Sequence, residues 1–317
     1  MAHLIESIAY TGATPWHGLG NQLSPHQPIE TWAKQAGMDW SIQEASVRYM
    51  TEANGTSGSI HSFPEHKVLF RSDTQTPLSV VSQRYQVVQP RDILEFYRDL
   101  TEISGFELET AGVLKGGRKI WALARTGQSM SLRGKDVTHG YVLLATACDG
   151  TLATTAQFTS IRVVCNNTLA IALANGSGIV KVPHSTSFEP EAVKKQLGIS
   201  VSAWGDFSDR MKALTERKVK AVEAERYLWH VFSDANKPIA SNERAIAKAL
   251  SLFDGQGKGA DLASAKGTAF GLLNAVTEFI DHERRAKSVD HRLESAWFGQ
   301  GATIKQKAFD QALLMVA

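Results

Sequence analysis

The sequence predicts an α+β fold, in which an antiparallel β-meander packs with helices and is followed by a C-terminal helical domain. Three observations predict it. Apolar residues between positions 93 and 103 recur at helical spacing. After residue 105, apolar and polar residues alternate in segments that glycine turns join, and after Pro190 the apolar residues return to helical spacing. We expect a loop-rich N-terminal segment over residues 1–66, an α+β domain over 67–190 and a helical domain over 191–317.

The first region is rich in glycine, proline, serine and histidine, which are typical of turns and loops. Within it, residues 29–36 predict a short helix that ends at Gly37. The apolar stretches Lys67–Arg71 and Leu78–Ser82 predict two strands, because both are rich in residues that favour strands and a turn around Pro77 separates them.

A helix is predicted to start at Pro90 and to stop at Gly105. Proline suits the first helical position, and glycine suits the position just past the last turn. Apolar residues recur at helical spacing in between, at Ile93, Leu94, Tyr97, Leu100 and Ile103.

The β-meander is predicted from alternating segments around two turns, Lys115–Arg118 and Asp149–Gly150, whose glycines accept positive φ. The residues Ile161–Ala174 then shift to helix-like spacing and predict a helix that ends at an Asn-Gly pair. The strands predicted around these features are Phe106–Leu114, Lys119–Arg125, His139–Cys148, Thr151–Thr159 and Ile179–Val182.

The last region predicts helices from amphipathic spacing, separated by Pro238 and by a glycine-rich linker over residues 254–260. These helices are expected at Asp206–Phe232, Ser241–Phe253, Thr268–Arg285 and Thr303–Val316.

Composition excludes several classes of protein. The chain has 317 residues, 43% of them hydrophobic and 21% charged, which is ordinary for a globular protein and excludes a disordered chain. The longest apolar run, Tyr141–Cys148, is far too short to span a bilayer, and Met1–Tyr10 lacks the pattern of a secretory signal. Two cysteines cannot form a disulfide framework, so we expect a reducing cytoplasm.

No nucleotide cofactor is predicted, because the chain contains neither a P-loop nor a glycine fingerprint for dinucleotides. Both cysteines, Cys148 and Cys165, are interpreted as small packing residues, although Arg162 is close enough in sequence to activate Cys165. A cation site near Glu278 and His282 is disfavoured, because the usual ligand spacings are missing. A lone histidine such as His17 is usually structural. We therefore expect no catalytic residue and no metal.

Charge segregation is the strongest functional signal. The chain carries a net charge of only +2, yet Thr110–Lys135 holds six basic residues and no acidic one, and Gly150–Phe188 also lacks acids. Basic side chains that follow a groove can neutralise phosphates, while aromatic faces stack on bases. The predicted nucleic-acid-binding residues are Lys115, Arg118, Lys119, Arg125, Arg133, Lys135 and Arg162, with Trp121, Phe158, Asn166 and Asn167 as candidates for base stacking or polar contacts. Composition alone favours equally that the aromatic residues are core and the basic ones ordinary surface.

The chain resembles a family of uncharacterised phage- and plasmid-encoded proteins with a domain of unknown function. The segments that carry this resemblance are Arg84–Phe96, Ala147–Leu173, Gly267–His282 and Glu294–Ala308, together with the short stretch Pro15–Gly20 near the start. The order helix, meander, helix is also similar to the fold of single-strand annealing recombinases of the RecT/Redβ type, with which it shares no residue-level motif. The family resemblance implies a mobile-element origin and a bacterial or viral cytoplasm, here the cytoplasm of a bacterial host cell. The similarity to the recombinases implies DNA bound by an oligomeric ring or filament.

We therefore expect a homo-oligomeric protein that binds single-stranded DNA and anneals complementary strands in phage or plasmid recombination, without ATP, covalent catalysis or a membrane. Apolar residues of the last helix, such as Phe309 and Leu314, and Trp32 near the start are candidates for subunit contacts. Two alternatives stay open. One is an enzyme acting on nucleic acid, which a cluster of residues in one deep pocket would favour. The other is a host-interaction protein, which a flat apolar surface would favour.

Overall fold

The computed structural model describes residues 5–12, 20–52, 58–102, 105–164, 167–171, 178–197, 201–233 and 239–317. Helices and antiparallel strands coexist in it, which confirms the α+β class. The chain divides into two compact units. Unit 1 comprises Met1–Arg125, Val142–Ala156 and Ile179–Leu197, and unit 2 comprises Thr126–Tyr141, Gln157–Gly178 and Gly198–Ala317.

The larger sheet has the strand order β10-β9-β8-β7-β6-β1-β2 in the described part of the chain, and β11 pairs with β9. The strands β7, β8 and β9 each contribute residues to both units. The bounds of the strands in this sheet are β1 Ile5–Thr11, β2 Asn21–Leu23, β6 Glu107–Leu114, β7 Lys119–Leu132, β8 Asp136–Ala147, β9 Thr154–Arg162, β10 Asn167–Ala170 and β11 Ile179–Val182.

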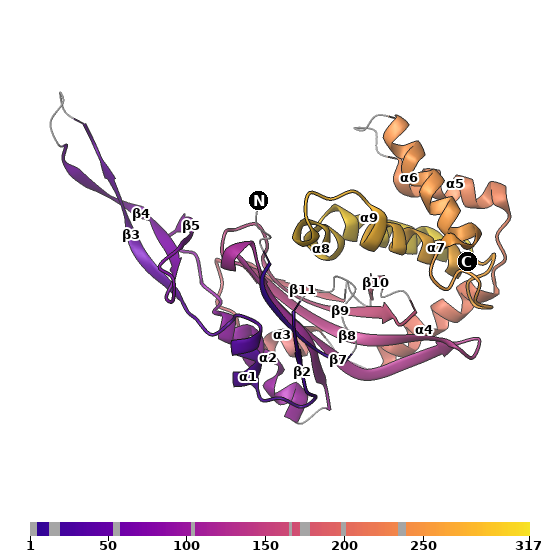
Figure 1. Ribbon diagram of the computed structural model, residues 1–317, viewed down its shortest axis with the longest axis horizontal. Helices are drawn as coiled ribbons and strands as arrows, with labels where there is room; N and C mark the ends of the chain where they lie inside the picture. Colours follow the sequence, from indigo (N-terminus) through magenta and orange to yellow (C-terminus); the bar gives the residue numbers. More distant parts are fainter. Residues whose placement is uncertain are drawn as a thin grey trace. The chain divides into compact units, whose positions relative to one another are not determined.

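The first sixty-six residues therefore contribute more regular structure than their loop-like composition suggests. The strand β1 pairs antiparallel with β6 and parallel with β2, so it belongs to the main sheet. A second sheet has the order β3-β4-β5, with β3 at Ile42–Met50, β4 at Ile60–Arg71 and β5 at Pro77–Ser82. Because β5 pairs only with residues 66–70 of β4, the strands β3 and β4 extend well beyond it as a two-stranded arm (Figure 1).

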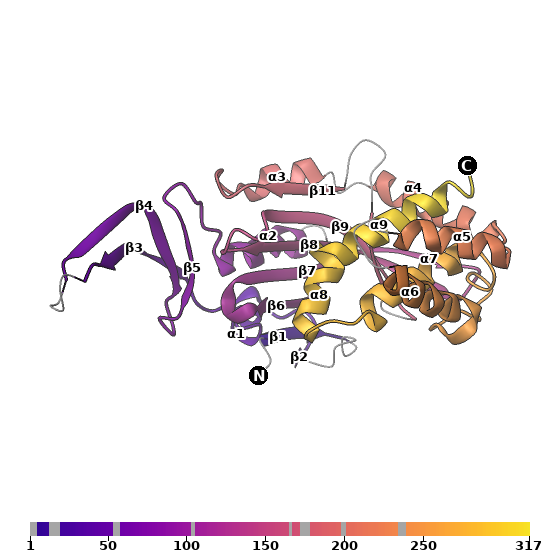
Figure 2. The same ribbon diagram turned by 90° about the horizontal axis from the view of Figure 1, so that it is seen from above.

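Two neighbouring helices line the sheet of unit 1, α1 at Ile29–Gln35 and α2 at Pro90–Glu102 (Figure 2). The side chains of α2 repeat at helical spacing and bury Ile93, Leu94 and Tyr97, as predicted. The Tyr97 hydroxyl donates to the carbonyl oxygens of Ala122 and Val142, at 2.8 and 3.0 Å. This hydroxyl thereby fastens α2 to neighbouring strands through an otherwise apolar core. The same unit contains α3, at Pro190–Leu197.

Unit 2 contains most of the helices. Their bounds are α4 Val201–Glu216, α5 Ala221–Phe232, α6 Ile239–Ser251, α7 Ala269–Glu278, α8 Val289–Phe298 and α9 Gln300–Leu313. A π-helical turn extends α6 over Leu252–Gln256, and another extends α7 over Phe279–Glu283. The helices α7 and α9 pack against β10, and α7 is buried along its whole length.

Two predicted helices were wrong. The helix predicted at Ile161–Ala174 is replaced in the described residues by the end of β9 and by β10, which pair antiparallel with Asn167 opposite Arg162. The β-branched residues here suit strands, and pairing within the sheet overrides the helical spacing. The helix predicted at Asp206–Phe232 is broken, because Lys218 forms a bridge with Thr268 between α4 and α5.

Candidate functional site

The predicted nucleic-acid-binding residues lie in both units. Two of them are only 4% exposed, Lys119 in unit 1 and Arg162 in unit 2, so their burial excludes contact with a strand in solution in this conformation. Arg133 is exposed at 38% and forms an ion pair with Glu216 at 2.8 Å. Of the remaining residues, Arg118 and Lys135 are exposed, and Lys115 and Arg125 are half-buried.

The predicted stacking residues are core residues. Trp121 and Phe158 are 1% and 2% exposed, so neither ring offers a face to a base. Phe158 instead packs edge-on against Trp204, with their ring centroids 6.3 Å apart. Asn167 is also buried, and Asn166 lies outside the described residues, as do His17 and Cys165.

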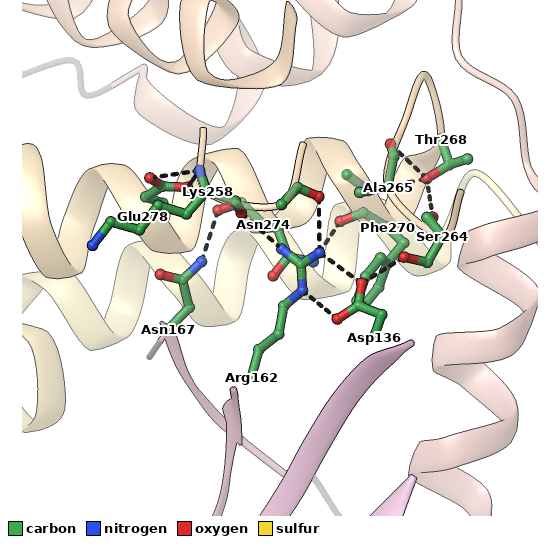
Figure 3. A network of polar contacts seen from close by, with 12 residues as sticks. Asp136, Arg162, Asn167, Lys258, Ser264, Ala265, Thr268, Phe270, Asn274 and Glu278 are labelled. Atoms are coloured by element: carbon green, nitrogen blue, oxygen red, sulfur yellow. Dashed lines mark hydrogen bonds and ion pairs between the residues drawn. The ribbon is translucent and has the colours of Figure 1, made fainter. Parts of the chain in front are cut away.

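Arg162 lies at the centre of a buried polar network in unit 2 (Figure 3). It ends β9, and Asp136 begins the neighbouring strand β8, so the sheet brings the two residues together. The guanidinium donates Nε and Nη2 to the two carboxylate oxygens of Asp136, at 2.7 and 2.6 Å. This two-point geometry is the strongest that an arginine forms with a carboxylate.

The loop before α7 completes the shell around this pair. Arg162 also donates to the carbonyl oxygens of Lys258 and Gly259, at 3.4 and 3.1 Å, and its guanidinium lies 5.2 Å from the centre of the Phe270 ring. The Ser264 hydroxyl donates to Asp136, so nearly every polar group of the pair has a partner.

The N-terminus of α7 is fixed in the same network. Thr268 is its N-cap and accepts a hydrogen bond from the Gly271 amide at 3.1 Å, while its hydroxyl donates to the Ser264 carbonyl oxygen at 2.8 Å. Farther along the helix, the Glu278 carboxylate accepts the Lys258 amide at 3.0 and 3.1 Å. Burial raises the pKa of Glu278 above its ordinary value, and the Lys258 amide and charge and Arg162 partly offset this shift.

A second buried ion pair joins α9 to the π-helical turn after α7, and β10 is bonded to both partners. The Lys305 ammonium donates to Asp281 at 2.7 Å and to the Thr168 hydroxyl at 2.6 Å, and the Thr168 amide donates to Asp281 at 2.7 Å. Desolvation lowers the pKa of Lys305, although Asp281 acts in the opposite direction. Asp281 and Glu278 thus face separate partners, and the described residues contain no group of three potential ligands that could hold a metal ion.

The buried network has no room for an organic substrate. The cavity beside Arg162, Asn167 and Asn274 has a volume of about 20 Å³, the size of a single water molecule. Charges buried at this depth cost several kcal/mol each unless they are paired and hydrogen-bonded, and here the two ion pairs are. The arrangement therefore fixes the packing of strands and helices in unit 2.

Cys148 lacks the environment of a nucleophile. It is buried, and this burial, with the nearby Asp149 charge, raises the pKa of its thiol to about 12. The thiol donates weakly to the carbonyl oxygens of Gly117 and Arg118, at 3.7 and 3.6 Å. A thiol that keeps its proton at neutral pH is a packing residue.

A larger pocket of about 320 Å³ lies in unit 1 between α1, α2 and the start of β6. Its hydroxyl groups are engaged with backbone, since Thr11 donates to Leu108 and Thr101 donates to Arg98. Arg98 itself is held by Glu95 and by Glu30. Cys148, Asp149, Glu278 and His282, the described residues considered for catalysis, are not among those that line this pocket.

Two exposed arginines mark the end of the sheet in unit 1. The Tyr85 hydroxyl donates to the Ala147 carbonyl oxygen at 2.6 Å, and the Cys148 amide donates to the Arg118 carbonyl oxygen at 2.9 Å. The residue after Arg84 thus contacts Ala147, while Arg118 contacts the next residue, Cys148. Both arginine side chains are exposed, and neither has a hydrogen-bond or carboxylate partner among the described residues.

The half-buried Tyr85 ring completes this end of the sheet. It stacks on His184 with ring centroids 4.4 Å apart, and His184 is fixed by the carbonyl oxygens of Gln86 and Leu152. We call Arg84, Arg118 and the Tyr85–His184 pair the arginine end. Sequence reasoning missed Arg84, because it lies outside every basic run, between Gln83 and Tyr85.

The fold and these sites define an α+β protein with a charged, closed core in one unit and exposed arginines in the other. Residues 77–297 match the model of the family described as Domain of unknown function (DUF932), which covers more than half of the chain. The chain belongs to this family. No curated protein and no solved structure matches it. The described residues contain no helix long and apolar enough to cross a membrane.

Three of the four longer segments that carry the family resemblance meet in the buried network of unit 2, while residues 15–19 lie outside the described residues. Ala147–Leu173 supplies Arg162 and Thr168, Gly267–His282 supplies the residues of α7, and Glu294–Ala308 supplies Lys305. The fourth segment, Arg84–Phe96, begins at the arginine end. The segments that carry the family resemblance thus supply the buried network of unit 2 and part of the arginine end of unit 1.

Proposed function

We propose that this protein binds single-stranded DNA and anneals complementary strands without ATP, as a protein of phage or plasmid recombination related in fold to the RecT/Redβ type. The observation that carries the proposal is the arginine end, where Arg84 and Arg118 are exposed without a carboxylate partner among the described residues. A cation that no internal acid neutralises is available to a phosphate.

The contact set is smaller than the sequence predicts. Arg118 remains from that set in unit 1, with the half-buried Lys115 on the same turn, and Arg84 is added. In unit 2, Lys135 is exposed on the turn between β7 and β8. Arg162, Lys119, Trp121, Phe158 and Asn167 are removed from the set, because all of them are buried.

The mechanism is physical. Each arginine would neutralise one phosphate and release condensed counterions, which makes binding favourable and dependent on salt. The half-exposed stack of Tyr85 on His184 offers an aromatic edge beside the phosphates, where a base can pack. A base that is held by stacking on its face keeps its hydrogen-bonding edge open to pairing with a second strand.

Binding of a fluorescent oligothymidine at several salt concentrations tests this proposal. We expect Arg84→Ala combined with Arg118→Ala to weaken binding and to reduce the slope of log affinity against log salt by about 1.4, since each lost phosphate contact on a single strand contributes about 0.7. The matched control is Arg91→Ala, which removes an exposed arginine of the same unit that is paired with Glu95. It should leave the slope close to that of the natural protein.

Annealing is measured separately, with complementary oligonucleotides, EDTA and no ATP. The natural protein should accelerate annealing, and the double variant should lose most of that acceleration. An unchanged salt slope in the double variant removes the arginine end from the site, and a strict requirement for metal or nucleotide contradicts the mechanism.

A further inference from the structure

The outer part of the β3–β4 arm exposes apolar side chains on both faces. We define this outer arm as Val47–Met50 with Ile60–Phe63, the part that extends beyond β5. Met50 and Ile60 are 65% and 67% exposed, and Tyr49 and Phe63 are 50% and 41% exposed. Exposed apolar residues grouped in this way mark an interaction surface.

The strand register shows how the outer arm is organised. Tyr49 is opposite His61 and Val47 is opposite Phe63, so these four side chains share one face. Tyr49 stacks on His61 at 5.3 Å, and Phe63 stacks on His66 at 4.9 Å. The stacks stiffen a two-stranded ribbon that would be only marginally stable by itself.

The strand β3 is also an open edge. It pairs only with β4 among the described strands. Near its start, the backbone amide and carbonyl of Ile42 are bonded to the Gln89 side chain, at 2.8 and 3.1 Å, which closes the edge there. From Gln43 onward, no other described strand covers the edge, and an uncovered edge is a template for a further strand.

The sequence of β3 is complementary to itself. If two copies pair antiparallel about Ser46, residue 44 of one lies opposite residue 48 of the other, and this happens twice because of the two-fold symmetry. Glu44 then faces Arg48 of the partner subunit, and Val47 faces Ala45 of the partner subunit. The paired residues point to the same face of the ribbon, because the register preserves the alternation of side chains.

The two charged residues are available for this contact. Arg48 is exposed and has no carboxylate partner among the described residues. Glu44 is 47% exposed and uses Oε1 for Lys67, at 2.8 Å. The second oxygen of Glu44 can therefore accept from Arg48 of the partner subunit while the internal pair is kept.

We propose that this protein self-associates through β3, which pairs antiparallel with β3 of a second copy about Ser46 and is held in register by the two Glu44–Arg48 contacts. The charges of the arm favour a second copy over nucleic acid. Three basic residues of the arm and its adjoining turn, Arg48, Lys67 and Arg71, are balanced by three acidic ones, Glu44, Glu65 and Asp73. The arm therefore carries no net positive charge that would attract phosphates. The inference does not rest on the proposed function, since it needs no DNA.

The arm replaces the subunit contacts expected from the sequence. Trp32 and Phe309 are 2% and 1% exposed, so each packs within its own unit. Leu314, near the C-terminus, remains exposed. The outer arm offers more apolar surface, together with an open edge and matching charges.

Reciprocal charge reversal tests the register. The variant Arg48→Glu places two acids opposite each other at both contacts, and Glu44→Arg places two bases there. The dimer of each variant alone should have a dissociation constant at least about ten-fold higher than that of the natural dimer, a change of about 1.4 kcal/mol in the free energy of association. The two variants mixed in equal amounts should associate with each other, because each then meets the opposite charge.

Sedimentation velocity without nucleic acid measures all four samples, the natural protein, the two variants and their mixture. Recovery in the mixture also shows that both variants are folded. A natural protein that stays monomeric up to about 100 µM overturns the proposal, since a shared edge and two ion pairs should give at least micromolar affinity. Equal dissociation constants for the natural protein and both variants also overturn it.

A cysteine placed on the symmetry axis gives a second measurement. In the proposed dimer, Ser46 lies opposite Ser46 of the partner subunit, at a Cα separation that suits a disulfide. Mild oxidation of Ser46→Cys should give a covalent dimer. Gln43→Cys should not, because residue 43 of one copy lies opposite residue 49 of the other and the two introduced cysteines are far apart along the strands. Equal cross-linking of both variants would contradict the register.

Discussion

The network around Arg162 and the outer arm of β3 and β4 invert the usual distribution of residues. In unit 2, the charged side chains of Arg162, Asp136 and Lys305 are buried and have several partners each. In the outer arm of unit 1, Tyr49 and Phe63 are exposed, and each stacks on a histidine of β4. Burial therefore follows available partners rather than residue type alone.

The difference has an energetic basis. A buried charge is tolerated only where its counter-charge and its hydrogen bonds are complete, so each member of the network depends on the others. An exposed aromatic residue loses little in the monomer and gains when a partner covers it. We therefore expect substitutions in the network to change the stability of the monomer, and substitutions in the arm to change association.

The largest effect is expected for Arg162→Leu. This change leaves the Asp136 carboxylate buried with Ser264 as its remaining side-chain partner, and an uncompensated buried charge typically costs about 3–5 kcal/mol. Urea unfolding at neutral pH measures the loss in the free energy of unfolding.

The double variant Arg162→Leu with Asp136→Leu is the control for that charge. It removes both ions, so it should be clearly more stable than Arg162→Leu, although the Gly259 carbonyl and Ser264 also lose their partner. A single variant that loses less than about 1 kcal/mol would show that the pair is not part of a closed core.

Truncation of one phenylalanine from each region compares the two regions directly, with a large effect expected for one and a small effect for the other. Phe158→Ala removes a ring that is 2% exposed and should cost about 3–5 kcal/mol, whereas Phe63→Ala removes a ring that is 41% exposed and should cost less than about 1 kcal/mol. Unfolding is followed at low protein concentration, so that association does not contribute. Equal losses for the two variants would contradict the exposed position of the arm.

Much of the fold follows from local patterns in the sequence. The helix α2 has a proline at its first position and five apolar residues at helical spacing, and the turn at Gly116 and Gly117 has the positive φ values, 68° and 103°, that glycine accepts. These features are local, so the sequence predicts them without knowledge of the rest of the chain.

The errors are non-local. The residues 167–170 pair with β9 as β10, and Thr168 is also bonded to Asp281 and Lys305, more than one hundred residues away. No pattern within the segment indicates those distant partners. Arg162 likewise reads as a surface cation, because its counter-ion Asp136 is 26 residues earlier. In the candidate site, the basic run in the sequence predicts Arg118. Arg84 is found only in the folded structure, where its neighbour Tyr85 is bonded to Ala147.

The smallest expected effect concerns Glu278, at the border of the buried network. Its pKa is raised in the folded state, chiefly by burial, while in the unfolded chain it returns to about its ordinary value of 4.5. Between these two values the folded state binds more protons than the unfolded state, so this carboxyl makes the folded state less stable as pH rises through the window. Above the window, the cost stays constant.

The variant Glu278→Gln removes this titration and keeps an oxygen that accepts the Lys258 amide. We expect its advantage over the natural protein to be absent below pH 4.5, to grow as pH rises through the raised pKa and then to level off. Urea unfolding of both proteins from pH 4 to pH 7 measures the difference, and Glu225→Gln on the exposed side of α5 is the matched control. A difference that does not vary with pH would mean that Glu278 is solvated like an ordinary surface carboxyl, and that the network ends before it.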